Sequence, residues 1–362
     1  LAPLLAGCAE QPKVIYSAAE LRDELQRRLG AEKGRSIVVP FEVDRALAER
    51  AQRFAFGVRT PQAQLEVLAV ALTSPDAFGI EYDVSLTLTA RETLARKRGD
   101  CLSLTGLFVG LARAIDLEVY FVDARGIQQF SSEGNLYVDR RHIVAGWGHP
   151  PQFTVIDFDR VMSPHVQYRI LTDIQALARY HNNLGFDELR SDRNAEAAEQ
   201  FRTALKLDPA FAAAHNNLAV ALARRNALAE AEEHLVTALG LDPFYSAAMI
   251  NLANLYDRTG RGPEAAKLRR DAGAMKLRDP MWRLEAGLEA FRVKDYERAI
   301  RELEAAVDLD DRIVIAWLRL AQSFEASGNR RKALHAVDHV LRVNPDLEEA
   351  KQIKARLTDK PS

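Results

Sequence analysis

The chain has 362 residues, of which 48% are hydrophobic and 28% are charged, and its formal net charge at pH 7 is −2. This length and composition predict a globular protein with more than one hydrophobic core. The near-zero charge gives no overall positive field, so no nucleic-acid partner is expected. The sequence has no run of about 18 consecutive apolar residues, the length that a membrane-spanning helix needs.

The first eight residues, Leu1 to Cys8, end in "LAGC", which resembles the lipobox of bacterial lipoproteins. The resemblance implies that residues 1–7 are the remnant of a signal peptide and that Cys8 carries a lipid. Residues 8–35 are then a tether and an N-terminal helix. The protein would lie in the bacterial cell envelope, on the periplasmic face of the outer membrane, with the lipid anchor as its only membrane contact. An apolar segment with a chance cysteine is the alternative.

The first third of the chain contains several helix-start signals. Two capping boxes and one proline-led start are present: Ser17 with Glu20, Thr89 with Glu92, and Thr60-Pro61. They predict helices over 18–29, 44–56, 61–73 and 90–97. Another helix is expected between Cys101 and about residue 115, where large apolar residues recur at helical spacing.

Strand-like segments follow these helices. "LEVYFVDA" (117–124), "RHIVAGW" (141–147) and "FTVIDFD" (153–159) are short, rich in β-branched or aromatic residues and bounded by turn residues. Helices followed by an antiparallel sheet predict an α+β domain, which we place at residues 36–172.

Cys101 lies in "KRGDCLSLTGLF", where a basic turn becomes an apolar helix. The chain has two cysteines, so a lipidated Cys8 leaves Cys101 without a disulfide partner. A helix start favours a thiolate, because the unpaired N–H groups and the helix dipole are positive there. The alternative is a buried cysteine that only fills the core. The Asp100 carboxylate would oppose a thiolate if it caps the helix.

His142 is the one of the eight histidines that lies inside a predicted strand. A turn centred between His149 and Pro150 places it directly opposite Asp157, on the same face of the sheet. The carboxylate could then accept the Nδ1 proton and leave Nε2 free to take the thiol proton. Asp159 is the diagonal neighbour and the reserve candidate.

These segments resemble the bacterial transglutaminase-like domains, members of the papain-like group in which Cys, His and Asp occur in this chain order. The segments that carry the resemblance are "RGDCLSLTGLFVGLARAIDLEVYFV", "RRHIVAGW" and "FTVIDFD". The resemblance implies Cys101 as nucleophile, His142 as general base and acid, and Asp157 as orienting residue. This chain departs from the family at Val144, where an aromatic residue is common, and at Phe158, where a proline is common. No cofactor or metal is expected.

The second half of the chain repeats with a period of 34 residues, the distance from Pro209 to Pro243. Small residues recur at one position, as in Gly185 and Gly287, and alanine recurs at another: Ala197, Ala231, Ala265, Ala299 and Ala333. Large residues recur at a third: Phe201, Leu235, Leu303 and Val337, with Arg269 breaking the series. The pattern resembles the tetratricopeptide repeat and predicts an all-α solenoid over residues 173–358, with about five repeats and a capping helix.

The repeat register aligns Asn183, Asn217 and Asn251 on the first helix of successive hairpins. By the resemblance these helices line the concave face, where a row of amides could hold the backbone of an extended peptide partner. Asparagine is also common at this position in the family, so a structural role is the alternative.

Two functions of different class follow from these patterns. The first is a periplasm-facing, lipid-anchored cysteine peptidase or amidase acting on a peptide or protein substrate, with repeats that recruit a protein partner. The second is a non-catalytic tetratricopeptide scaffold whose first domain is inactive. A true transglutaminase, which transfers the acyl group to an amine, is a further alternative to hydrolysis.

Overall fold

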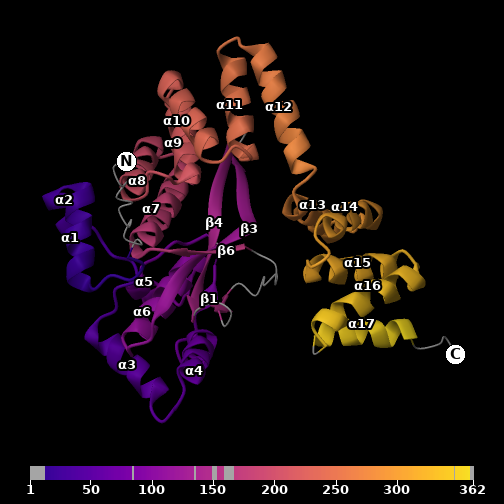
Figure 1. Cartoon of the computed structure of the whole chain (residues 1–362), viewed down its shortest axis with the longest axis horizontal. Helices are drawn as coiled ribbons and strands as arrows, with labels where there is room; N and C mark the ends of the chain where they lie inside the picture. The colour runs from indigo at the N-terminus through magenta and orange to yellow at the C-terminus, as the bar shows by residue number, and fades with distance from the viewer. Residues whose placement is uncertain are drawn as a thin grey trace, which may run out of the picture. The chain divides into compact units, whose positions relative to one another are not determined.

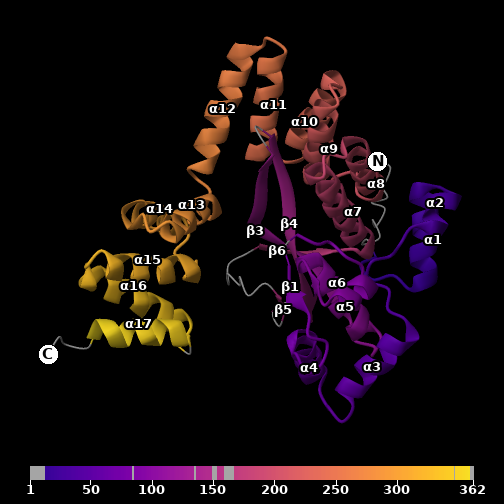
Figure 2. The ribbon, with the colours of Figure 1, turned by 180° about the vertical axis from the view of Figure 1, so that it is seen from behind.

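The computed structural model describes residues 13–83, 85–133, 136–148, 153–158, 167–345 and 347–358, without the side chains of 125–141, 167 and 276. The chain divides into two compact units. The first unit contains the described residues of Leu1–Arg125, Val138–Arg160 and Tyr168–His234. The second contains those of Gly126–Tyr137, Val161–Gln167 and Leu235–Ser362. Figures 1 and 2 show the chain from two opposite sides.

Helices open the first unit, and most begin where the sequence predicts. They are α1 (Ala18–Leu29), α2 (Ala31–Ser36), α3 (Arg45–Ala55), α4 (Pro61–Thr73), α5 (Ala90–Arg96) and α6 (Cys101–Arg113). Both predicted capping boxes are formed, and Thr60 caps α4 with Pro61 at its first turn. The short helix α2 and a parallel pair of two-residue strands, β1 (Glu81–Tyr82) and β2 (Arg98–Gly99), carry no periodic signal and were not predicted.

A four-stranded sheet follows, in the order β5-β4-β3-β6. Its strands are β3 (Val119–Glu133), β4 (Leu136–Trp147), β5 (Thr154–Ile156) and β6 (Gln167–Leu171). Helix α6 is buried from Cys101 to Ala112, and the Thr105 hydroxyl donates to the carbonyl of Ile143 at 3.1 Å. This bond sets the position of α6 along β4. Position 146 of β4 has room only for glycine, because an added Cβ would lie 2.4 Å from the ring of Phe153.

The end of α6 is joined to the start of α7 (Asp173–Arg190) by a buried ion pair. The guanidinium of Arg113 donates two hydrogen bonds to the carboxylate of Asp173, at 3.0 and 2.9 Å. The same carboxylate accepts from the backbone N–H of Tyr16, and the N–H of Asp173 donates to the carbonyl of Val14. The residues just before α1 are therefore bound at this junction.

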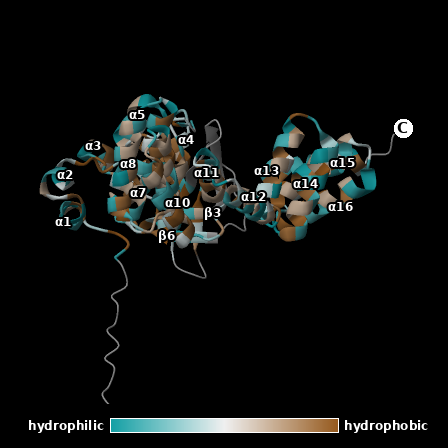
Figure 3. Cartoon of the chain, turned by 90° about the horizontal axis from the view of Figure 1, so that it is seen from above, coloured by the Kyte–Doolittle hydropathy of each residue, from teal (hydrophilic) through white to brown (hydrophobic). Residues whose placement is uncertain are grey.

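Helical hairpins make up the rest of the chain. The helices after α7 are α8 (Asn194–Leu207), α9 (Ala212–Arg224), α10 (Leu228–Leu241), α11 (Ser246–Arg258), α12 (Gly262–Lys276), α13 (Pro280–Arg292), α14 (Tyr296–Leu309), α15 (Val314–Ala326), α16 (Arg330–Val343) and α17 (Glu348–Thr358). The predicted close-packing position is confirmed, since all five alanines are fully buried: Ala197, Ala231, Ala265, Ala299 and Ala333. Hydrophobic (brown) and hydrophilic (teal) residues are interleaved along these helices (Figure 3).

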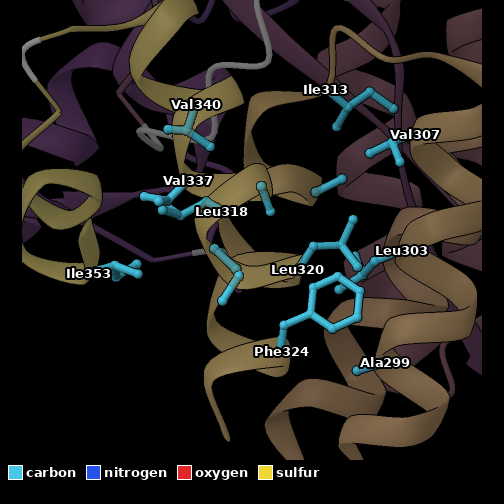
Figure 4. Packing of buried hydrophobic residues seen from close by; sticks show 14 of the residues in the cluster. Ala299, Leu303, Val307, Ile313, Leu318, Leu320, Phe324, Val337, Val340 and Ile353 are labelled. Atoms are coloured by element: carbon cyan, nitrogen blue, oxygen red, sulfur yellow. The ribbon is translucent and has the colours of Figure 1, made fainter. Parts of the chain in front are cut away.

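In the second unit, one hydrophobic core joins α13 to α17 (Figure 4). Leu303, Leu320 and Phe324 pack at one end of it, and Ile353 brings α17 into it. The predicted capping helix is therefore present. Arg269, which breaks the series of large residues, pairs with Asp257 and Asn254 at the surface. Among the described residues, no helix is both long and apolar enough to cross a membrane.

The small-residue position gives the first testable prediction. A Cβ added at Gly185 would lie 2.6 Å from the ring of Phe201, whereas a Cβ added at Gly273 of α12 would meet nothing within 4 Å. Gly185→Ala is expected to destabilise the fold by about 1–3 kcal/mol through overpacking. Gly273→Ala, the matched control, is expected to stabilise it by about 0.5–1 kcal/mol because alanine favours a helix. Denaturant unfolding measures both, and equal effects of the two changes would contradict the packing argument.

Candidate active site

Cys101 is the first residue of α6 and is 7% exposed. The preceding residue, Asp100, is the N-cap of the helix, and its carboxylate accepts from the backbone N–H of Ser103 at 2.8 Å. The strand β2 ends at Gly99, so the thiol follows directly on the β1–β2 pair. The predicted helix start is confirmed. The sequence left open whether the Asp100 carboxylate caps the helix, and in the structure it does.

His142 of β4 lies next to Asp157, and the two side chains are 2.9 Å apart between Nε2 and Oδ2. Both are buried, with 0% and 4% of the side chains exposed. The pairing of these two residues was predicted, but the ring atom was not. Asp157 contacts Nε2, so Nδ1 is the nitrogen left for exchange with a thiol. Nδ1 is buried and has no hydrogen-bond partner within the part of the chain that the structure describes.

The predicted strand register is wrong by two residues. Ala145 pairs with Ile156, so continuation of the register places Val144, and not His142, level with Asp157. Side chains alternate between faces with a period of two, so a two-residue offset keeps His142 and Asp157 on one face, as diagonal neighbours. An offset of one residue would have separated them. The T-shaped contact of Phe158 with Phe108 of α6, at 5.5 Å between ring centroids, holds the end of the strand against the helix.

The charge state of His142 reflects two opposing effects. Burial lowers its pKa, but the hydrogen bond to Asp157 and the nearby Cys101 thiol outweigh burial and raise the pKa from 6.5 to about 10. The ring is therefore an imidazolium at neutral pH. The Cys101 sulfur is the second group that raises the pKa of the ring, after Asp157.

The basic residues before Cys101 have other partners. Lys97 donates to the carbonyl of Phe78 at 2.6 Å, and Arg98 forms an ion pair with Asp83 at 3.6 Å. The sequence suggests that these cations could favour a thiolate, but these two charges are directed elsewhere. His142 is the cation that the structure places beside the thiol.

A buried network around Asp100 was not predicted. Oδ1 accepts from the hydroxyl and N–H of Ser103, and Oδ2 accepts from the hydroxyl of Thr87 at 2.5 Å and from the Asn183 amide at 3.4 Å. The Asp-x-x-Ser spacing at 100–103 is a helix N-cap signal that predicts the first part. The contact from Asn183 spans 83 residues and leaves no local sequence signal.

The row of asparagines lies inside the fold. Asn183, Asn217 and Asn251 are 3%, 0% and 1% exposed. The Asn217 amide donates to Asn182 at 2.9 Å and accepts from Asn216 at 3.0 Å, while Asn183 donates to Asp100. An extended peptide can bind only to accessible amides, so the burial of these three side chains disfavours the predicted peptide-binding row without testing it.

Two predicted residues lie outside the described part of the chain: Cys8, with its lipid, and Asp159, the reserve carboxylate. Among the residues that are described, no group of three histidine, cysteine, aspartate or glutamate side chains could hold a metal ion.

The second unit has a pocket of about 590 Å³ between α14, α15 and α16. Trp317 and Phe324 line it with apolar surface. Lys332 crosses it to form an ion pair with Glu304 at 2.9 Å, with its ammonium 5.0 Å from the centre of the Phe324 ring. The pocket combines aromatic surface with both signs of charge.

Comparison with protein families finds tetratricopeptide repeats at residues 183–246 and 290–357. The C-terminal half of the chain is therefore built of tetratricopeptide repeats. No match to a curated protein was found.

Solved structures that resemble the chain include YrrB, a tetratricopeptide protein "with an unusual peptide-binding site", at 18% identity over 49% of this chain and 92% of that chain, with a TM-score of 0.26. PilF of Pseudomonas aeruginosa is 19% identical over 51% of this chain and 87% of that chain, with a TM-score of 0.28. The MamA protein is 17% identical over 51% of this chain and 98% of that chain, with a TM-score of 0.26.

Proposed function

We propose that the first part of the chain is a cysteine-dependent acyl-transfer enzyme, a peptidase or amidase, and that the repeats bind a peptide or protein. The observation that carries the proposal is the buried His142–Asp157 pair at 2.9 Å, with the Cys101 thiol beside the same ring. Three side chains from α6, β4 and the end of β5 converge there, in the chemical roles of nucleophile, acid–base and orienting residue. The resemblance to transglutaminase-like domains supports the same roles.

The first half-reaction consumes the thiolate of Cys101. Its sulfur bonds to the carbonyl carbon of an amide, and the carbonyl electrons move to oxygen. The backbone N–H of Cys101, at the first position of α6, is the donor that we propose for this oxyanion. When the C–N bond breaks, Nδ1 of the His142 imidazolium gives its proton to the departing amine, which leaves a thioester and a neutral ring.

The second half-reaction releases the product. Neutral His142 takes a proton from water, the hydroxyl oxygen bonds to the thioester carbon, and the C–S bond breaks to return the thiolate and the imidazolium. An amine in place of water would make the reaction a transfer. We favour water, because transfer requires a site that excludes it and nothing in the described residues indicates such a site.

Alkylation of the thiol by iodoacetamide tests the proposal without a known substrate. Cys101 in the folded protein is expected to react at neutral pH, because the thiol lies at a helix start and beside the His142 imidazolium. His142→Ala is expected to move the reaction to higher pH. Mass spectrometry of the modified residue gives the rate. If Cys101 does not react while the protein is folded, and His142→Ala changes nothing, the catalytic proposal is wrong.

The burial of Cys101 and His142, 7% and 1% exposed, favours the second candidate, an inactive domain attached to an interaction scaffold. Tetratricopeptide repeats generally bind proteins or peptides, and the pocket beside Trp317 offers aromatic and charged surface for a partner. The alkylation experiment separates the candidates, since an inactive core thiol resists the reagent. The envelope location and the lipid on Cys8 remain part of the proposal, and the "LAGC" motif supports them.

A further inference from the structure

The first helix of the first repeat forms a hydrogen bond with the residue that caps the helix of the proposed nucleophile. On α7, Tyr180 and Asn183 lie one turn apart and are 6% and 3% exposed. Asn183 donates to Oδ2 of Asp100 at 3.4 Å. The pKa of Tyr180 is raised by burial and then by the charges of Glu92, Asp100 and Asp187, so its hydroxyl stays neutral beside this carboxylate.

The Asp100 carboxylate is 1% exposed and directly precedes Cys101. A buried negative charge next to a thiol opposes the thiolate unless donors around it offset the charge. One oxygen is satisfied by Ser103, within the same helix turn. The other accepts from groups outside the turn that include Thr87, before α5, and Asn183, in the repeats.

We propose that Asn183 is a positioning residue for Cys101: its amide offsets and orients the Asp100 carboxylate, so that the first repeat tunes the reactivity of the nucleophile. This inference rests on the proposed function. It makes α7 a part of the catalytic unit, and it gives the asparagine of the first repeat a role that differs from those of Asn217 and Asn251. Thr87 shares the task, because its hydroxyl donates to the same oxygen.

The test compares isosteric variants of the full chain. Asn183→Leu removes the amide and keeps the shape of the side chain. With one donor gone, the field of Asp100 on the thiol increases, and the pH at half-maximal alkylation by iodoacetamide is expected to rise by about half a unit, which slows alkylation about threefold at a fixed lower pH. Thr87→Val should move the pH profile in the same direction, and it keeps the inference testable if Asn183→Leu does not fold.

Asn217→Leu is the matched control. It makes the same change at the same repeat position, in a residue that is 0% exposed and whose amide donates to Asn182. It is expected to lower the melting temperature without shifting the alkylation profile. Equal profiles for Asn183→Leu, Thr87→Val and wild type, with a reactive wild-type Cys101, would overturn the positioning role alone. An unreactive wild-type Cys101 would instead overturn the proposed function.

Discussion

Replacing Cys101 with alanine is expected to abolish thioester formation and amide hydrolysis while the fold remains intact. The sulfur is the only atom of the proposed site that bonds to the substrate, and removal of such a nucleophile lowers turnover by roughly 10⁴- to 10⁶-fold in comparable triads. The side chain is small and 7% exposed, so its loss leaves a minor cavity. Capture of an acyl-enzyme by mass spectrometry, with a peptide amide as substrate, measures the effect.

Cys101→Ser is the companion variant, because it keeps the volume and a weak nucleophile. Both variants should melt within a few degrees of the wild type and should bind any partner of the repeats equally well. Residual cleavage at the wild-type rate in Cys101→Ala would show that the chemistry takes place elsewhere. Loss of partner binding in the same variant would show that the thiol has a structural role in addition to the proposed chemical one.

Asp157→Asn is expected to have the second largest effect. An amide oxygen can still accept the Nε2 hydrogen, so the ring keeps a partner, but the negative charge of Asp157, which helps to offset burial, is gone. The pKa of His142 should then fall from about 10. Turnover is expected to drop about 10²- to 10⁴-fold at neutral pH, because the imidazolium that protonates the leaving amine is depleted. The alkaline limb of the pH–rate profile should move to lower pH.

The same substitution alters the pH dependence of stability. A histidine whose pKa is raised on folding stabilises the protein fully below its unfolded value of 6.5, and this contribution is lost as the pH rises through about 10. Unfolding free energies of the wild type should therefore decline between these limits, and those of Asp157→Asn should decline less. Asp76→Asn, a charge change at an exposed residue of the same unit, is the control and should leave the slope unchanged. Parallel slopes for Asp157→Asn and wild type would contradict the ion pair.

Much of the fold could be predicted from local sequence signals. Capping residues such as Thr60 and Thr89 fix helix starts through bonds to residues three positions ahead, so they can be read from the sequence. The repeats could also be predicted from the sequence, because helices that cross closely admit only small residues at the crossing. At Gly287, for example, an added Cβ would lie 2.5 Å from Leu303. Strand β6 (Gln167–Leu171) was not predicted, although its first four residues alternate between polar and apolar.

The site was predictable only in part. Strand periodicity alone decides that His142 and Asp157 share a face of the sheet. The predicted register was wrong by two residues, and an even offset leaves the face unchanged. The ring nitrogen that meets the carboxylate depends on a side-chain rotation, about which the sequence says nothing. The environment of the asparagine row depends on which surface the repeats cover. Asn183 meets a carboxylate 83 positions away, and repeat periodicity cannot reveal that contact.

The bonds at the start of α7 have a mechanical consequence. Val14 and Tyr16 are both hydrogen-bonded to Asp173, which is held in turn by Arg113 at the end of α6. Tension applied to the chain ahead of residue 13 therefore passes first into this junction, and α1 is loaded only after the junction yields. Because α6 begins at Cys101 and ends at Arg113, the helix that carries the thiol at one end would bear such a pull at the other.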